Sequence, residues 1–194
     1  MHAVDRPVDH RPVLVCYGDS ITAGYGLDLD QAYPALLQRK LAGLGYNYSV
    51  INQGTSGATT KDAVAELPAV LRLHPAVVIL EFGGNDGLRG LPVAESQRNL
   101  DRVLSGLQNA HARIVLAGIT LPPQYGQEYI RSFEQMFRTL AASHHVALIP
   151  MLYVNLVHVP GTIQGDGIHP TAKGSAIIAA TIFQVLKPML RRAP

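Results

Sequence analysis

The sequence predicts an α/β fold: one domain in which helices cover both faces of a five-stranded parallel sheet. Short apolar runs rich in branched residues alternate with longer amphipathic segments, the pattern of strand–helix–strand units. The apolar runs lack polar alternation, as do strands that are buried on both faces. The 194 residues contain no internal repeat or linker, which suits one domain over residues 13–194 behind an N-terminal extension of residues 1–12.

Apolar runs and apolar periodicity predict the individual elements in chain order. Strands are expected at residues 13–17, 48–52, 76–82, 114–118 and 146–149. Helices are expected over residues 33–44, from Thr59 or Thr60 to 71, over 93–109, over 127–143, and from Pro170 or Thr171 to about 187. A threonine hydroxyl can cap the second of these helices, and Pro68 inside it is expected to bend it.

Composition excludes several classes of protein. Hydrophobic residues make up 47% and charged residues 15%, so the chain is not disordered. The formal charge of +2 comes without clusters of Lys and Arg, so no nucleic-acid partner is expected. The one cysteine, Cys16, excludes an internal disulfide and a multi-cysteine metal site.

No membrane-spanning segment is expected either. Residues 139–165 carry no Asp, Glu, Lys or Arg, but they contain three histidines and two prolines and are better interpreted as a strand and a loop. The first seven residues lack the apolar core of a signal peptide. The protein is then cytoplasmic, or periplasmic or secreted if a leader was removed.

Small and polar residues follow the predicted strands. They are Gly18-Asp19-Ser20, Gly54-Thr55-Ser56-Gly57, Gly83-Gly84-Asn85-Asp86-Gly87 and Leu121-Pro122-Pro123, with Gly165-Asp166-Gly167-Ile168-His169-Pro170 ahead of the last helix. The carboxyl ends of parallel strands share one edge of the sheet, and ligands bind there. These segments are therefore expected to gather at one site.

Three of these side chains suit nucleophilic catalysis. Ser20 lies at a strand-to-helix turn, and its hydroxyl needs a base to become a nucleophile. His169 is the candidate base, and Asp166 can fold back to hold its other ring nitrogen. The backbone N–H groups of Ser20 and Gly57 and the side-chain amide of Asn85 can donate to an oxyanion, each donor typically worth about 10²–10³ in rate.

Together these blocks resemble the SGNH, or GDSL-type, hydrolases: Gly18-Asp19-Ser20, Gly57, Gly84-Asn85-Asp86 and Asp166-x-x-His169-Pro170, in family order. Residues 82–90 and 121–126 are similar to the bacterial acyl-thioesterase I, lysophospholipase and arylesterase group. The resemblance implies a flavodoxin-like three-layer sandwich, no metal or organic cofactor, and the roles given above for Ser20, Gly57, Asn85, Asp166 and His169. It also implies that residues 87–92 and Leu121 border the acyl pocket, with Gly84, Leu88, Leu121 and Pro122 binding substrate.

The sequence departs from the family pattern at two positions. Ile21 replaces the leucine of the family name, and Ala58 follows Gly57 where an acid is common in that group. The second departure can alter the rim of the site.

Other residues near these blocks have simpler interpretations. Asp19 and Asp86 are expected to hold loop backbone, and Cys16 to be a small buried side chain. Arg89 is equally a solvated surface residue or a contact for an acidic headgroup. Ser56, a competing nucleophile, lacks the strand-to-helix placement.

The expected function is that of a serine esterase or thioesterase acting through an acyl-serine. Aryl esters, short-to-medium acyl esters, acyl-CoA and lysophospholipid all suit this chemistry, and a carbohydrate acetylesterase of the same family is the alternative. A nucleotide or flavin binder, a metal-dependent hydrolase using Asp19, Asp166 and His169, and a non-catalytic module are disfavoured. An α/β-hydrolase is excluded because Ser20 lacks the second glycine of Gly-x-Ser-x-Gly.

Overall fold

A computed structural model describes residues 9–156 and 158–192 of the chain. Its centre is a five-stranded, all-parallel sheet in the order β2-β1-β3-β4-β5. The strands are β1 (Val13–Gly18), β2 (Ser49–Gly54), β3 (Val77–Glu81), β4 (Arg113–Ala117) and β5 (Ala147–Ile149). All five strands lie within a residue or two of their predicted positions.

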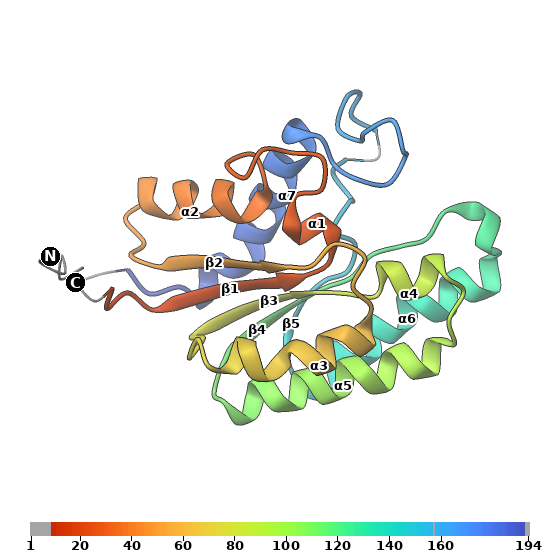
Figure 1. The fold of residues 1–194 in the computed structure, drawn as a ribbon, viewed down its shortest axis with the longest axis horizontal. Coiled ribbons are helices and arrows are strands. Elements are labelled where there is room, and N and C mark those ends of the chain that lie inside the picture. The colour runs from red at the N-terminus through yellow and green to blue at the C-terminus, as the bar shows by residue number, and fades with distance from the viewer. Residues whose placement is uncertain (1–8, 157, 193–194) are drawn as a thin grey trace, which may run out of the picture.

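Helices cover both faces of this sheet, as predicted (Figure 1). Helices α2 (Tyr33–Gly43) and α7 (Ala172–Leu186) pack together on one face. Helices α3 (Thr60–Leu71), α5 (Val93–Asn109) and α6 (Gln127–His144) cover the other. Of the expected N-terminal extension, residues 1–8 lie outside the described residues.

The apolar core fills both layers between helices and sheet. β3 is buried along its whole length, which explains its unbroken run of apolar residues up to Glu81. The α5 and α6 helices bury one stripe each, as their periodicity predicts; these stripes are Leu100, Val103, Leu104 and Leu107 on α5, and Phe133, Met136, Phe137 and Leu140 on α6.

Helix starts follow the capping rules. The Thr59 side chain accepts a hydrogen bond from the Asp62 N–H, and the Asp62 side chain accepts one from the Thr59 N–H, which forms a capping box at the start of α3. At α7 the Thr171 hydroxyl accepts a hydrogen bond of 3.3 Å from the Gly174 N–H. Pro68 lies inside α3, which continues past it to Leu71.

Strand register brings the polar segments to one edge of the sheet. Gly18 at the end of β1 pairs with Gly54 on β2 and with Glu81 on β3. The segments that follow these three residues therefore begin side by side. Two short helices stand at this edge, α1 (Ser20–Ala23) after β1 and α4 (Gly84–Leu88) after β3 (Figure 1).

Candidate active site

Ser20 is the first residue of α1, directly after the turn that ends β1. Asp19 caps this helix, since its carboxylate accepts a hydrogen bond of 3.0 Å from the Ile21 N–H. The first N–H groups of a helix have no partner within the helix. The Ser20 N–H therefore faces outward beside its own hydroxyl.

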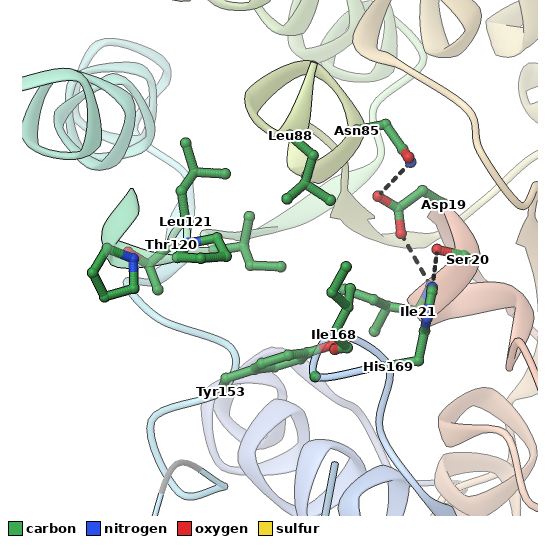
Figure 2. A pocket seen from close by; sticks show the side chains of 15 residues that line it. Asp19, Ser20, Ile21, Asn85, Leu88, Thr120, Leu121, Tyr153, Ile168 and His169 are labelled. Carbon is green, nitrogen blue, oxygen red and sulfur yellow. Dashed lines mark hydrogen bonds between the residues drawn. The ribbon is translucent and has the colours of Figure 1, made fainter. Parts of the chain in front are cut away.

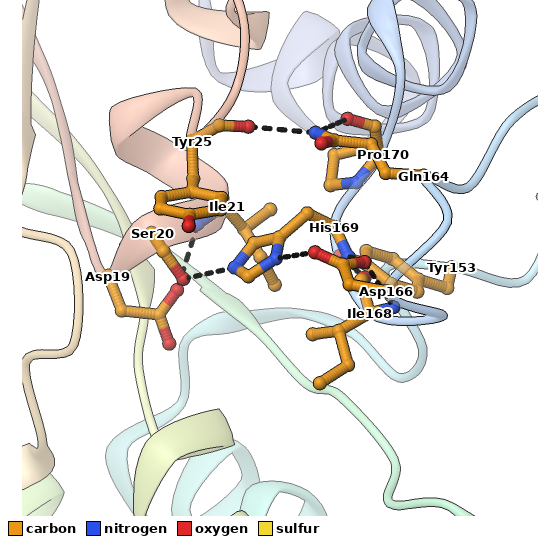
Figure 3. Close-up of polar contacts among 10 residues, drawn as sticks. All are labelled: Asp19, Ser20, Ile21, Tyr25, Tyr153, Gln164, Asp166, Ile168, His169 and Pro170. Carbon is orange, nitrogen blue, oxygen red and sulfur yellow. Dashed lines mark hydrogen bonds and ion pairs between the residues drawn. The ribbon is translucent and has the colours of Figure 1, made fainter.

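The Ser20 hydroxyl, His169 and Asp166 form a continuous hydrogen-bonded chain (Figure 3). His169 Nε2 lies 2.9 Å from Ser20 Oγ, and His169 Nδ1 lies 2.6 Å from Asp166 Oδ2. The second Asp166 oxygen accepts hydrogen bonds from the Ile168 N–H at 2.9 Å and the His169 N–H at 3.0 Å. The three residues that the sequence singles out therefore lie in contact.

The charge on Asp166 sets the tautomer of His169. Hydrogen bonds from the Ile168 N–H and from the His169 side chain lower the Asp166 pKa to about 2, so this carboxyl is ionised at neutral pH. An ionised carboxylate only accepts hydrogen bonds, so the proton lies on His169 Nδ1. His169 Nε2 is then free to accept the Ser20 proton.

The candidate oxyanion donors lie on three neighbouring segments. Gly57 has a φ of 81°, a left-handed conformation that favours glycine. Among the described residues, neither the Ser20 N–H nor the Gly57 N–H has an acceptor. The Asn85 amide donates to Ala58 O at 2.9 Å and to Asp19 Oδ2 at 3.3 Å, and Arg89 donates to Gly57 O at 2.9 Å.

Asp86 holds the base of this site together, as expected from the sequence. Its carboxylate accepts hydrogen bonds from the Thr60 N–H and hydroxyl at 2.9 and 2.6 Å, and from the Ser96 hydroxyl at 3.1 Å. These contacts tie α4 to the starts of α3 and α5. All three residues are buried.

A buried glutamate behind Ser20 belongs to the candidate site, and sequence reasoning missed it. Glu81 is 1% exposed and Asp19, directly before Ser20, is 2% exposed. Glu81 Oε2 accepts hydrogen bonds from the Thr22 hydroxyl at 2.9 Å and the Asp19 N–H at 3.3 Å. Burial raises the Asp19 pKa to about 6; burial and the Asp19 charge raise the Glu81 pKa well above its ordinary value. The only sequence signal was a lone acid at the end of an apolar run.

An apolar pocket of about 500 Å³ opens beside Ser20 and His169 (Figure 2). The four residues expected to bind substrate, Gly84, Leu88, Leu121 and Pro122, all line it. Within residues 87–92, Leu88 is the residue that lines the pocket, and Gly57 is not among its lining residues. Sequence reasoning missed the remaining walls, which are Asp19, Ile21, Ile119, Thr120, Pro123, Tyr153, Gly167 and Ile168.

The described residues present neither a metal-binding cluster nor a helix able to span a membrane. Over residues 9–156 and 158–192, no group of three His, Cys, Asp or Glu side chains is arranged to hold a metal ion. In the same ranges, every helix is too short or too polar to cross a bilayer.

Residues 16–177 match the GDSL-like Lipase/Acylhydrolase family. The chain belongs to this family. Its members hydrolyse acyl esters, and this GDSL-like hydrolase is accordingly an ester hydrolase. The resemblance predicted from the sequence is confirmed.

The comparisons with individual proteins agree with this assignment. Esterase TesA of Pseudomonas aeruginosa is 42% identical to the GDSL-like hydrolase over 178 residues, covering 91% of this chain and 89% of the relative. Thioesterase 1/protease 1/lysophospholipase L1 of Escherichia coli is 36% identical, covering 91% and 84%. A crystal structure of TesA superposes with a TM-score of 0.88 at 41% identity, covering 92% of this chain and 99% of that one, which confirms the predicted fold.

Proposed function

We propose that the protein hydrolyses carboxylic esters and thioesters through an acyl-enzyme formed on Ser20. The observation that carries the proposal is the hydrogen-bonded chain from Ser20 through His169 to Asp166, at the mouth of an apolar pocket. This arrangement pairs a nucleophile with a base, and the base with an orienting anion.

Acylation begins when His169 Nε2 takes the Ser20 proton and Ser20 Oγ attacks the carbonyl carbon. The imidazolium that forms is stabilised by the ionised Asp166, 2.6 Å from Nδ1. The tetrahedral intermediate then collapses, and His169 Nε2 gives its proton to the leaving alcohol or thiol. In deacylation, His169 deprotonates a water that attacks the acyl group, which releases the carboxylic acid and restores Ser20.

Three donors serve the oxyanion in both steps: the N–H groups of Ser20 and Gly57 and the Asn85 side chain. The Asn85 amide has two protons, and its bond to Asp19 is the longer of its two at 3.3 Å. That proton is the one that turns to the oxyanion, while the bond to Ala58 O keeps the side chain in place. The left-handed conformation of Gly57 sets the direction of its own N–H, one of the three proposed donors.

The pocket accommodates the acyl portion of the substrate. Its walls are mainly apolar side chains from the ends of β3 and β4 and from the segments that follow β5, which suits aliphatic or aryl groups. We infer that aryl esters, short-to-medium acyl esters, acyl-CoA and lysophospholipids are substrates. The names of the relatives, which include an esterase and a thioesterase/lysophospholipase, support this range.

Hydrolysis of p-nitrophenyl esters from acetyl to palmitoyl, beside an acyl-CoA series, tests the proposal. Ser20→Ala and His169→Ala should each lower kcat by roughly 10⁶-fold, and Asp166→Asn by about 10⁴-fold through the wrong tautomer. Ser56→Ala, which removes a hydroxyl from the neighbouring loop, is the matched control and should keep the parental rate. Similar mild losses in all three of the first variants would contradict the assignment of roles.

A further inference from the structure

The main chain of His169 is held in a short antiparallel hairpin. Ile163 pairs with Pro170 as a β-bridge, and the Gln164 N–H donates to His169 O at 2.8 Å. The Gly167 N–H closes the turn by donating to Gln164 O at 3.0 Å. Gln164 is therefore the residue directly opposite His169 across the hairpin.

The Gln164 side chain reaches from this hairpin to the segment that carries Ser20 (Figure 3). Its Nε2 donates to Tyr25 O at 2.8 Å and to Pro170 O at 2.9 Å. Tyr25 is itself tied to α1, because its N–H donates to Ser20 O at 3.0 Å. Within the described chain, the Ser20–His169 contact is the other hydrogen bond between residues 19–27 and residues 160–171.

Gly26 makes the approach of Gln164 possible. Its φ is 74°, and a Cβ at this position would lie 2.6 Å from Gln164 Oε1. A larger residue would therefore push the amide away from Tyr25 O. The loop after α1 is shaped to receive this one side chain.

The ring of Tyr25 lies over the imidazole of His169. The ring centroids are 4.5 Å apart with an angle of 36° between the planes, and Tyr25 is 53% exposed. Here its face lies against the ring that gains a positive charge in each catalytic step, and aromatic faces attract cations.

We propose that Gln164 and Tyr25 form a clasp that positions His169 for proton transfer with Ser20. The inference rests on the proposed function, in which His169 is the base. Gln164 fixes the distance between the hairpin and the nucleophile's helix, and Tyr25 fixes the plane of the imidazole. Both are positioning residues, because neither is required to touch the substrate.

The Gln164 contact of this clasp is near the surface, so a substitution there can change the position of His169 without lowering the stability of the fold. The Gln164–Tyr25 bond is exposed, so water can replace it when the side chain is changed. A change at Gln164 should therefore leave the fold intact but let the hairpin drift relative to Ser20. Misplacement of a reacting group by about 1 Å can cost 10²-fold in rate.

Gln164→Glu is the decisive variant, since it keeps the shape of the side chain and removes both donors. We expect kcat for p-nitrophenyl butyrate to fall roughly 10- to 100-fold with KM within about twofold and an unchanged Tm. Tyr25→Ala should lower kcat roughly two- to fivefold, and Tyr25→Phe, which keeps the ring, should recover the rate. Gln184→Glu, an exposed change on α7, is the matched control.

Two further measurements distinguish positioning from a general structural effect. In a His169→Ala background, Gln164→Glu should cause no additional loss of the residual activity, because there is no imidazole left to position. In proton NMR, the downfield resonance of the hydrogen between His169 Nδ1 and Asp166 should shift or broaden in Gln164→Glu and persist in Gln184→Glu.

The outcomes also separate this inference from the proposed function. A parental kcat in Gln164→Glu, or equal losses in the wild-type and His169→Ala backgrounds, would overturn the clasp. Full activity of His169→Ala alone would instead overturn the proposed function on which the clasp depends.

Discussion

Replacing Glu81 with glutamine tests whether a neutral carboxylic acid lies behind Ser20. Glu81 and Asp19 are both almost fully buried, and burial raises the pKa of each carboxyl. Glutamine reproduces the shape of a protonated glutamate and still accepts from the Thr22 hydroxyl and the Asp19 N–H. Glutamine cannot ionise, so Glu81→Gln removes the titration of this side chain and keeps its hydrogen bonds.

The sign of the effect follows from proton uptake. The unfolded chain ionises Glu81 near pH 4.3, whereas the folded protein retains the proton to a higher pH, so folding binds protons over the interval between these pKa values. Wild-type stability therefore falls as pH rises through that interval, by about 1.4 kcal/mol per pH unit for this one group. The variant should therefore gain stability relative to wild type as pH rises above about 4.3, and the gain should level off at the pH where folded Glu81 ionises.

Guanidinium unfolding followed by far-UV circular dichroism at pH 5, 6, 7 and 8 measures this difference, since the chain contains no tryptophan. Glu95→Gln, an exposed change on α5, is the control and should run parallel to wild type. Two results would contradict the prediction: parallel curves of unfolding free energy for wild type and Glu81→Gln, or a variant that loses stability relative to wild type as pH rises. Either would mean that Glu81 is ionised in the folded protein.

Three further predictions concern the pocket, the core and the thiol. Leu121→Ala enlarges the acyl pocket, so the ratio of kcat/KM for octanoate over acetate p-nitrophenyl esters should rise; an unchanged ratio would place the acyl chain elsewhere. Asp86→Ala leaves the Thr60 and Ser96 donors buried without an acceptor and should cost about 2–4 kcal/mol of unfolding free energy in guanidinium titrations. Cys16 is fully buried, which raises its thiol pKa, so Ellman's reagent should react only after denaturation.

The fold was predictable because each strand carries its own signal. The strand in the run 76–82 lies at the centre of the sheet and is buried on both faces. Its apolar residues therefore identify it as a strand without any knowledge of the strands that pair with it. The short helix α4 was not predicted, because Gly84 and Gly87 in a five-residue segment favour a turn. Asp86 in this helix accepts hydrogen bonds from α3 and α5, and contacts between distant segments leave no local sequence pattern.

The polar residues of the candidate site were predictable because they follow strands, as Ser20 and Asn85 do, or precede the last helix, as Asp166 and His169 do. Ser20, Asn85 and His169 each lie in a short motif whose glycine, proline or acidic residue can be recognised from the sequence alone. The pocket walls Tyr153 and Ile168 come from a long irregular segment, where apolar side chains carry no periodicity. Glu81 was missed because its significance depends on Asp19, 62 positions away along the chain.

Ser20 and His169 are separated by 149 positions, yet their side chains meet. In the proposed mechanism the nucleophile Ser20 is synthesised long before its base His169, so the nascent chain carries an inactive serine until the hairpin that contains His169 docks. Ester turnover is consequently a reporter of complete folding. Circular dichroism reports the formation of the sheet and its helices. The appearance of ester product in a refolding assay would report the later step in which His169 comes into contact with Ser20.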